Sequence, residues 1–456
     1  MSSPKPRSST RRSKSPSVRR RHHGRSDRDP IEEARARSLE QLKHNACPHG
    51  IVASPIDRRN YRAIWSRDGC ICAVAAYVSG DEELVASARR TLRTVAEHQA
   101  DNGQVPSYLL IDDDDEIRHA NYGGWGEITS IDSSLWFLIA CQTAFMRRKE
   151  SEFIDDPLFA TYRRVFRYLF AVDANSCGLL EIPIAGDWTD IFNRSYHVLY
   201  DEVLWYRALR SGARLAEHAS EGHERSYYDK AARLVRQRIN DEFWWDHNHV
   251  VARVAQRYKI RHDLPKHPDF HYYQSHLTPF LNDWFTRFDS FANILAALLG
   301  VASPERTAAI IREVFRRKLD HPYPLRVLDP PIEPGDPDSH SLLLSEEPPF
   351  VYHNGGIWPL AGGFWVMLLS LVGKKADARK ALRRLAAALR LPATKNDEWG
   401  FYEHLHGRTG EAMGTRDLSW NAAAYLLAYH AAVQDQFPAF TEHEERGAGP
   451  APRPAG

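Results

Sequence analysis

The sequence has few cysteines and no long apolar run. Its five cysteines are widely spaced, an odd number without the spacing of a disulfide framework or a zinc site: Cys47, Cys70, Cys72, Cys141 and Cys177. No stretch of 18 uncharged apolar residues occurs, so we expect no transmembrane helix. These absences favour a protein of the reducing cytoplasm that requires no metal and no other cofactor.

Lysine and arginine are concentrated at one end of the chain. Residues 1–29 hold ten of them against two aspartates, among serines and prolines and without an apolar core. This composition excludes a signal peptide or membrane anchor and predicts a disordered, solvated tail. A weak contact of this tail with nucleic acid or another anionic surface is the alternative. Residues 436–456 form a second expected tail, and residues 30–435 the expected catalytic domain.

Hydrophobic residues make up 43% of the chain and include 12 tryptophans, enough for a large core. Six apolar segments recur about 65 residues apart. They begin near residues 69, 132, 199, 289, 356 and 418. Amphipathic segments at 84–96, 157–172, 228–243, 304–315 and 376–391 follow the first five, and another covers 31–43.

Such paired helices predict an all-α fold, an (α/α)6 toroid with apolar helices inside and amphipathic helices outside. Strand patterns are sparse, and Val250–Val254 is the one short strand expected. Residues 256–282 and 322–349 are expected to be rim loops.

The loops that lead into the apolar segments are rich in aromatic and acidic residues and poor in lysine. In a toroid these loops converge on one mouth. Aromatic faces and hydroxyl-accepting acids suit a neutral polyhydroxylated ligand such as a sugar, whereas a phosphate site would need more lysine or a glycine-rich loop. In the turn Gly186–Asp190, an acid beside Trp188 would be partly desolvated, which raises its pKa toward that of a proton donor.

Four motifs resemble those of known enzymes: Tyr-His-Asn-Gly-Gly-Ile-Trp-Pro at 352–359, Ile-Asp-Ser-Ser-Leu-Trp at 131–136, Trp-Thr-Asp at 188–190, and Glu403 upstream of Arg-Thr-Gly at 408–410. They are similar to motifs of six-hairpin glycoside hydrolases, above all neutral/alkaline invertases, related α-glucosidases and the amylo-α-1,6-glucosidase part of glycogen debranching enzymes. The resemblance covers residues 60–429. It departs at Thr415–Trp420 and on the far side of the catalytic aspartate, which puts the identity of the sugar in doubt.

The resemblance implies an inverting reaction, in which one carboxyl group protonates the glycosidic oxygen and one carboxylate activates water. It assigns Asp190 as the acid and Glu403, in a polar setting, as the base. Asp187 is the nearest competitor for the acid and Glu398 for the base. The expected substrate-binding residues are Trp65, Arg67, Asp68, Trp125, Asp132, Asp187, Trp188, His353, Asn354, Trp358, Arg416 and Trp420.

The expected function is therefore hydrolysis of a small soluble glycoside, of sucrose type or an α-glucoside, with amylo-α-1,6-glucosidase as the alternative. Two alternative functions belong to other classes of protein. One is a terpenoid cyclase, with Asp112–Glu116 as a magnesium-diphosphate site, and the other is a non-catalytic binder of sugar or nucleic acid. A sugar epimerase on the same ring would need paired histidines. The expected partner is a small carbohydrate rather than a membrane, and a homo-oligomer is compatible with the sequence.

Overall fold

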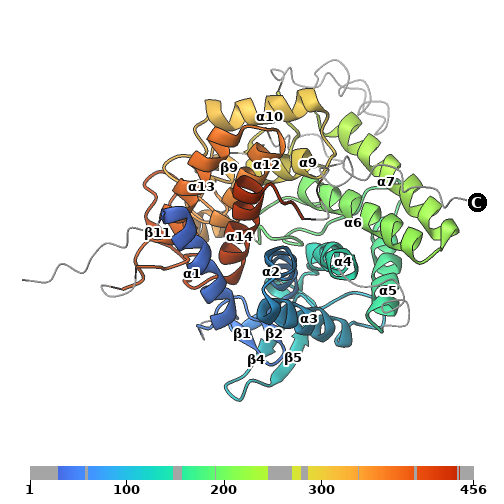
Figure 1. Cartoon of the computed structure of the whole chain (residues 1–456). Helices are drawn as coiled ribbons and strands as arrows, with labels where there is room; N and C mark the ends of the chain where they lie inside the picture. The colour runs from blue at the N-terminus through green and yellow to red at the C-terminus, as the bar shows by residue number, and fades with distance from the viewer. Residues whose placement is uncertain are drawn as a thin grey trace, which may run out of the picture.

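The computed structural model describes residues 29–56, 60–146, 157–190, 192–244, 270–278, 286–336, 338–394, 398–438 and 441. Within these residues, six helices form an inner ring (Figure 1). They are α2 (Ser66–Ser79), α4 (Ile131–Phe145), α6 (Leu199–His218), α9 (Ser290–Leu298), α12 (Pro359–Leu371) and α14 (Ser419–Gln434). Each begins within about three residues of the predicted position, because continuous apolar runs can be buried on all sides.

A second set of helices covers the ring from outside (Figure 1). These are α1 (Pro30–His44), α3 (Glu82–Glu97), α5 (Pro157–Val172), α7 (Gly222–Glu242), α10 (Pro304–Arg316) and α13 (Lys375–Leu389). In α3 the buried residues include Leu84, Ala88, Leu92 and Val95, whose spacing puts them on one face, and Asp81 caps the first turn. The predicted all-α toroid is confirmed.

The first and last helices close the ring. Each inner helix contacts the next, and α14 contacts α2. The outer partner of α14 is α1, from the opposite end of the chain. The hydroxyls of Tyr425 and Tyr429 donate hydrogen bonds of 2.9 and 2.7 Å to the Ile31 carbonyl and to Glu32. The segment 31–43 thus completes the sixth hairpin.

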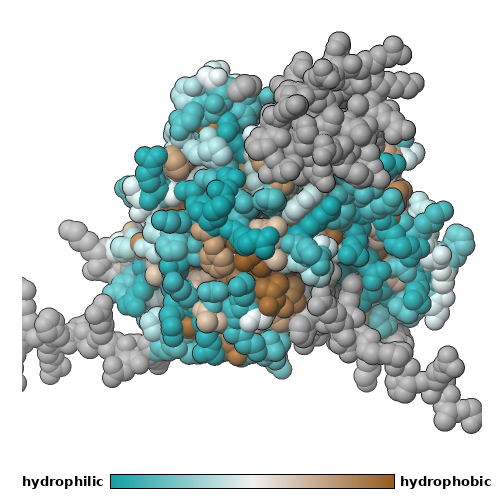
Figure 2. All heavy atoms as spheres, turned by 90° about the horizontal axis from the view of Figure 1, so that it is seen from above, coloured by the Kyte–Doolittle hydropathy of each residue, from teal (hydrophilic) through white to brown (hydrophobic). Residues whose placement is uncertain are grey.

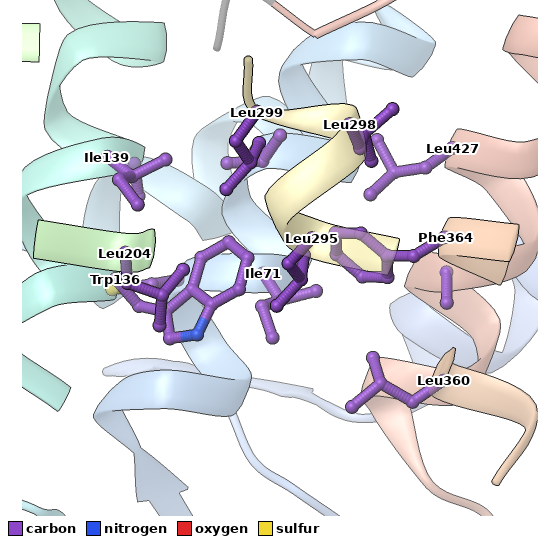
Figure 3. Packing of buried hydrophobic residues seen from close by; sticks show 14 of the residues in the cluster. Ile71, Trp136, Ile139, Leu204, Leu295, Leu298, Leu299, Leu360, Phe364 and Leu427 are labelled. Carbon is purple, nitrogen blue, oxygen red and sulfur yellow. The ribbon is translucent and has the colours of Figure 1, made fainter. Parts of the chain in front are cut away.

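Side chains fill the centre of the ring. Figure 3 shows Ile71, Trp136, Leu204, Leu295 and Phe364 approaching one another from five different inner helices, and Leu427 adds the sixth. The toroid is consequently a packed core, so a ligand has to bind at one of its ends.

Strands are more numerous than the sequence predicts. β3 (Ala63–Trp65), β4 (Tyr108–Ile111) and β5 (Ile117–Asn121) form an antiparallel sheet. These strands are too short for an alternating pattern to show in the sequence. The predicted strand Val250–Val254 lies outside the described residues.

Two-residue strands brace other loops. The antiparallel pairs are β1 (Ala46–Cys47) with β2 (Gly50–Ile51), β6 (His197–Val198) with β7 (His276–Leu277), β8 (Phe288–Asp289) with β9 (Leu328–Asp329), and β10 (His404–Leu405) with β11 (Ala412–Met413). Two of these strands, β6 and β8, run directly into inner helices, as β3 does. The rim segment 322–349 contains β9 and the short helix α11 (Ser341–Glu346), and η1 (Trp125–Glu127) precedes α4.

The acidic run between β4 and β5 is a hairpin turn. Asp112 accepts hydrogen bonds from the backbone of Asp114 and Glu116. Arg62 forms ion pairs of 2.8 and 3.0 Å with Asp113 and Asp115. The run is therefore a braced surface turn, which does not favour a diphosphate site.

The described residues extend slightly past both ends of the predicted domain 30–435. Asp29 caps α1 by accepting a hydrogen bond from the Ile31 amide. Phe437, two residues beyond the expected end at residue 435, is 9% exposed and packs against the core.

One face of the molecule is mainly polar. Figure 2 shows a hydrophilic face on which apolar side chains occur in small groups. No helix in the described part of the chain is long and apolar enough to cross a membrane.

Candidate active site

The N-terminal ends of the inner helices meet at one end of the ring. Arg67, in the first turn of α2, bonds Asp132 in the first turn of α4 at 3.0 Å. The Tyr200 hydroxyl, on α6, lies 3.4 Å from the same Asp132. Trp358 lies edge-on to Trp420 at 5.7 Å, which joins α12 to α14. The loops that precede these helices therefore converge, and the positive ends of the helix dipoles favour acidic groups there.

Asp190 lies at this mouth, at the end of the turn Gly186–Asp190, with a positive φ of 50°. The Tyr352 hydroxyl donates a 2.9 Å hydrogen bond to Asp190 Oδ2. Burial raises the pKa of Asp190 to about 6, although the Arg67 charge and the Tyr352 bond act to lower it. Because that value is close to neutral, Asp190 can carry a proton where an ordinary aspartate cannot.

Glu403 is held by two donors. The Tyr61 hydroxyl donates a 2.7 Å bond to Oε1, and the Thr415 amide a 3.3 Å bond to Oε2. A Cβ on Gly414 would lie 2.5 Å from Oε2, and the φ of Gly414 is 73°. Only glycine leaves the carboxylate in this place without displacement. The charge of Glu403 also raises the pKa of Asp190, so the two groups lie within electrostatic reach.

Asp68 and Arg67 lie beside these carboxyl groups. Burial raises the pKa of Asp68 to about 7, although the Arg67 charge lowers it. Arg67 Nε lies 3.4 Å from Asp68 Oδ1, an atom that accepts no hydrogen bond from the described residues. A buried oxygen without a donor is costly, and a ligand hydroxyl would supply one.

Five ring side chains contact one another at the mouth, and we call them the aromatic floor: Trp188, His353, Trp358, His404 and Trp420. This floor carries further polar atoms without partners. Within the described residues, both ring nitrogens of His353 and His404 and the indole nitrogens of Trp188 and Trp420 have no hydrogen-bond partner. Both histidine rings stack on Trp358, at 4.5 and 5.6 Å. Burial lowers the pKa of His353 well below its usual range, so its ring is neutral. A neutral imidazole offers one donor and one acceptor, which suits hydroxyl groups.

Both carboxylate oxygens of Asp187 accept hydrogen bonds from the protein. Its Oδ1 accepts bonds from the amide and hydroxyl of Thr189, both at 2.7 Å. Its Oδ2 accepts a 3.1 Å bond from Arg194, which also bonds Asp289, the cap of α9. With both oxygens engaged, Asp187 braces the turn that carries Asp190.

Asn354 and Trp358 also bond to the protein. The Asn354 amide group makes three bonds, to the backbone N–H and C=O of Ile332 and to the Glu347 carbonyl. Trp358 is fully buried, and its indole donates to the Tyr352 carbonyl. These two residues therefore brace the loop that carries Tyr352.

The other expected residues lie around the rim. Trp65 is partly exposed, and its ring lies tilted against that of Tyr108 with the centroids 4.6 Å apart. Arg416 is partly exposed, with Nε 3.5 Å from Asp417. The competitor base Glu398 is largely exposed and pairs with Arg390, which caps α13 of the outer ring. The side chain of Trp125 lies outside the described residues.

Sequence reasoning missed four residues that support the acids: Tyr61, Arg194, Tyr352 and Gly414. Tyr352 begins the Tyr-His-Asn-Gly-Gly motif, which was the available indication. For the others the sequence offers none, because each meets its partner only in the folded chain.

Two family models match the chain on either side of residue 270. Residues 49–264 match the six-hairpin glycosidase domain of bacterial α-L-rhamnosidases, and residues 271–434 match alkaline and neutral invertases. The chain is a six-hairpin glycoside hydrolase. The first model covers Asp68, Asp132 and Asp190, and the second covers Tyr352 and Glu403.

Curated relatives and solved structures agree with this assignment. Probable alkaline/neutral invertase F of Arabidopsis thaliana is 22% identical over 420 residues, 81% of this glycoside hydrolase and 80% of the relative. Cytosolic invertase 1 of Oryza sativa is 23% identical over 424 residues, 81% and 71% of the two chains. The GH63 mannosylglycerate hydrolase of Thermus thermophilus has a TM-score of 0.60 at 14% identity, covering 86% and 99%. A bacterial glucoamylase also has a TM-score of 0.60, at 15% identity, covering 92% and 59%. At these identities the two structures support the fold.

Proposed function

We propose that this glycoside hydrolase cleaves sucrose or a small glycoside of sucrose type, with inversion at the anomeric carbon. The observation that carries the proposal is the pair Asp190 and Glu403, each held by a tyrosine hydroxyl at the mouth of the ring. The substrate class is suggested by the curated relatives, which are named invertases.

In the proposed reaction Asp190 donates its proton to the glycosidic oxygen as the bond to the anomeric carbon breaks. Glu403 removes a proton from a water molecule that attacks the same carbon from the opposite face. Each carboxyl group thus ends in the other's starting protonation state, and exchange with solvent restores both. The raised pKa of Asp190 supports its role as the donor.

The sugar ring is proposed to bind over the aromatic floor. Asp68 Oδ1 would accept a sugar hydroxyl bond, and His353, His404, Trp188 and Trp420 offer further buried polar atoms. Arg67 is already bonded to Asp132 and lies beside Asp68, so its charge is balanced by the protein. These features suit an uncharged sugar, and we place the activity in the cytoplasm, as for the cytosolic relative.

The test is a panel of sucrose, isomaltose, trehalose, panose and glycosylglycerates, with the anomer of fresh product followed by NMR. We expect turnover of sucrose and an inverted product. Preference for isomaltose or panose would replace the sucrose assignment by an α-glucosidase, and a retained anomer would refute inversion. Interconversion of a free hexose without hydrolysis would favour an epimerase that uses His353 and His404.

The role of Asp190 is tested with glycosyl fluorides, whose leaving group needs little acid help. Asp190→Asn should nearly abolish turnover of sucrose and spare the fluoride. If Asp187→Asn shows this dependence on the leaving group and Asp190→Asn does not, the acid is Asp187.

A further inference from the structure

Tyr352 contacts both halves of the site. Its hydroxyl donates to Asp190, and its ring lies edge-on to that of His404 at 5.1 Å, next in the chain to Glu403. Its carbonyl accepts bonds from the Trp358 indole at 3.1 Å and the Gly356 amide at 2.9 Å. Tyr352 is therefore held at its backbone, its ring and its hydroxyl.

Both partners of the hydroxyl bond have unusual backbones. The φ of Tyr352 is 48° and that of Asp190 is 50°, a left-handed region that bulky side chains rarely occupy. The surrounding structure maintains these conformations, since the Asn354 side chain ties the turn to Ile332 and Glu347. Strained residues that are held in this way tend to lie at functional sites, where they fix a group in advance.

We propose that Tyr352 is the positioning residue of the proton donor. Its hydroxyl holds Asp190 in the orientation for proton transfer and stabilises the carboxylate that remains after transfer. In that step the Asp190 O–H bond breaks, a new O–H bond forms on the glycosidic oxygen, and the bond from that oxygen to the anomeric carbon breaks. Tyr352 keeps its own proton throughout. This inference rests on the proposed role of Asp190.

The charges around Asp190 agree with this role. Burial raises the pKa of Asp190, and the Tyr352 bond lowers it, as expected for a donor that favours the anion. The titratable and charged groups that act on Asp190 or feel its charge are Tyr61, Arg67, Asp187, Glu347, Tyr352 and Glu403. Among these groups, Tyr352 is the one that donates a hydrogen bond to the Asp190 carboxylate within the described residues.

The test is the pH profile of kcat/KM for Tyr352→Phe, with the best substrate of the panel and with its glycosyl fluoride. The basic limb, set by Asp190 near pH 6 in the parent, should move up by about one pH unit. Turnover of the natural substrate should fall about tenfold, and turnover of the fluoride much less. A purely structural role would lower both rates together and leave the limb in place.

Tyr61→Phe is the matched control, because it removes a similar hydroxyl from Glu403 instead of Asp190. It should leave the basic limb unchanged. If Tyr352→Phe does not fold, site-specific 2,3-difluorotyrosine at position 352 provides a stronger donor of the same shape. That replacement should move the limb down.

An unmoved limb in either Tyr352 replacement overturns the inference. Failure of the proposed function is seen separately. If Asp190→Asn hydrolyses the natural substrate at the parent rate, the acid assignment falls. If Asp190→Asn behaves as expected but the basic limb of the pH profile does not move in Tyr352→Phe, only the proposed role of Tyr352 is wrong.

Discussion

Gly414→Ala should inactivate the enzyme while leaving it folded. The new Cβ would lie 2.5 Å from Glu403 Oε2 and 2.7 Å from His404 Nδ1. Real Cβ atoms do not approach so closely, so the Glu403 carboxylate has to move or rotate. A displacement of about 1 Å in a catalytic group can cost roughly 10²-fold in rate, and we expect a loss of that size in kcat.

The backbone contribution can be separated from this effect. Gly414 has a φ of 73°, and alanine in this region costs about 1–2 kcal/mol. For a chain of this length the unfolding entropy is of order 0.9 kcal/mol/K, so Tm should fall by only about 1–2 °C. Gly80→Ala is the matched control, because its φ is 69° and a Cβ there meets nothing within 4 Å. It should show the same fall in Tm and the parent kcat.

The assay combines initial rates on sucrose with thermal unfolding followed by circular dichroism. Retention by Gly414→Ala of more than about a third of parental kcat would refute the displacement argument. A similar loss in Gly80→Ala would attribute the effect to backbone strain in general.

Four further predictions concern the whole enzyme. Glu403→Gln should keep the parent melting curve and lose roughly 10²–10⁴ in kcat; near-parental turnover would remove Glu403 as the base. Because Asp190 must be protonated and its pKa is raised to about 6, kcat/KM should fall as pH rises through that value, and a flat profile to pH 8 would contradict this. Dialysis against EDTA should leave activity unchanged; a loss that magnesium alone restores would favour the cyclase reading. A truncation that begins at Asp29 should fold and turn over normally. One that begins at Pro30 loses the cap on α1, which should lower the free energy of unfolding by about 1 kcal/mol. Aggregation of the truncation that begins at Asp29 would mean that residues 1–28 contribute to folding.

The helices of the ring could be predicted because their patterns are local. Nearly continuous apolar runs such as Leu360–Leu371 can be buried only in an inner layer, and a stripe such as Leu84, Ala88 and Leu92 covers such a layer from outside. The strands were missed because β3, β4 and β5 are three to five residues long and held mainly by pairing with one another.

The candidate site could be predicted only as a set of loops. Asp190 and Glu403 were selected through motifs and Asp68 as an expected substrate-binding residue, and the three gather at one mouth as expected of a toroid. Asp187 and Asn354 were expected to bind substrate, yet in the structure both bond fully to the protein. Residue type alone does not distinguish these cases, since the same carboxylate or amide can serve a ligand or the protein.

The sequence by itself determined which segments are buried, which are amphipathic, and which loops carry acids and aromatic rings, because these properties depend on neighbours within a few turns of helix. The tertiary structure decided which side chain donates a hydrogen bond to each catalytic carboxyl group. Tyr61 meets Glu403 and Tyr352 meets Asp190 across separations of 342 and 162 residues. The position of each proton depends on those distant contacts and on burial, since both set the balance between the charged and neutral forms of a carboxyl group.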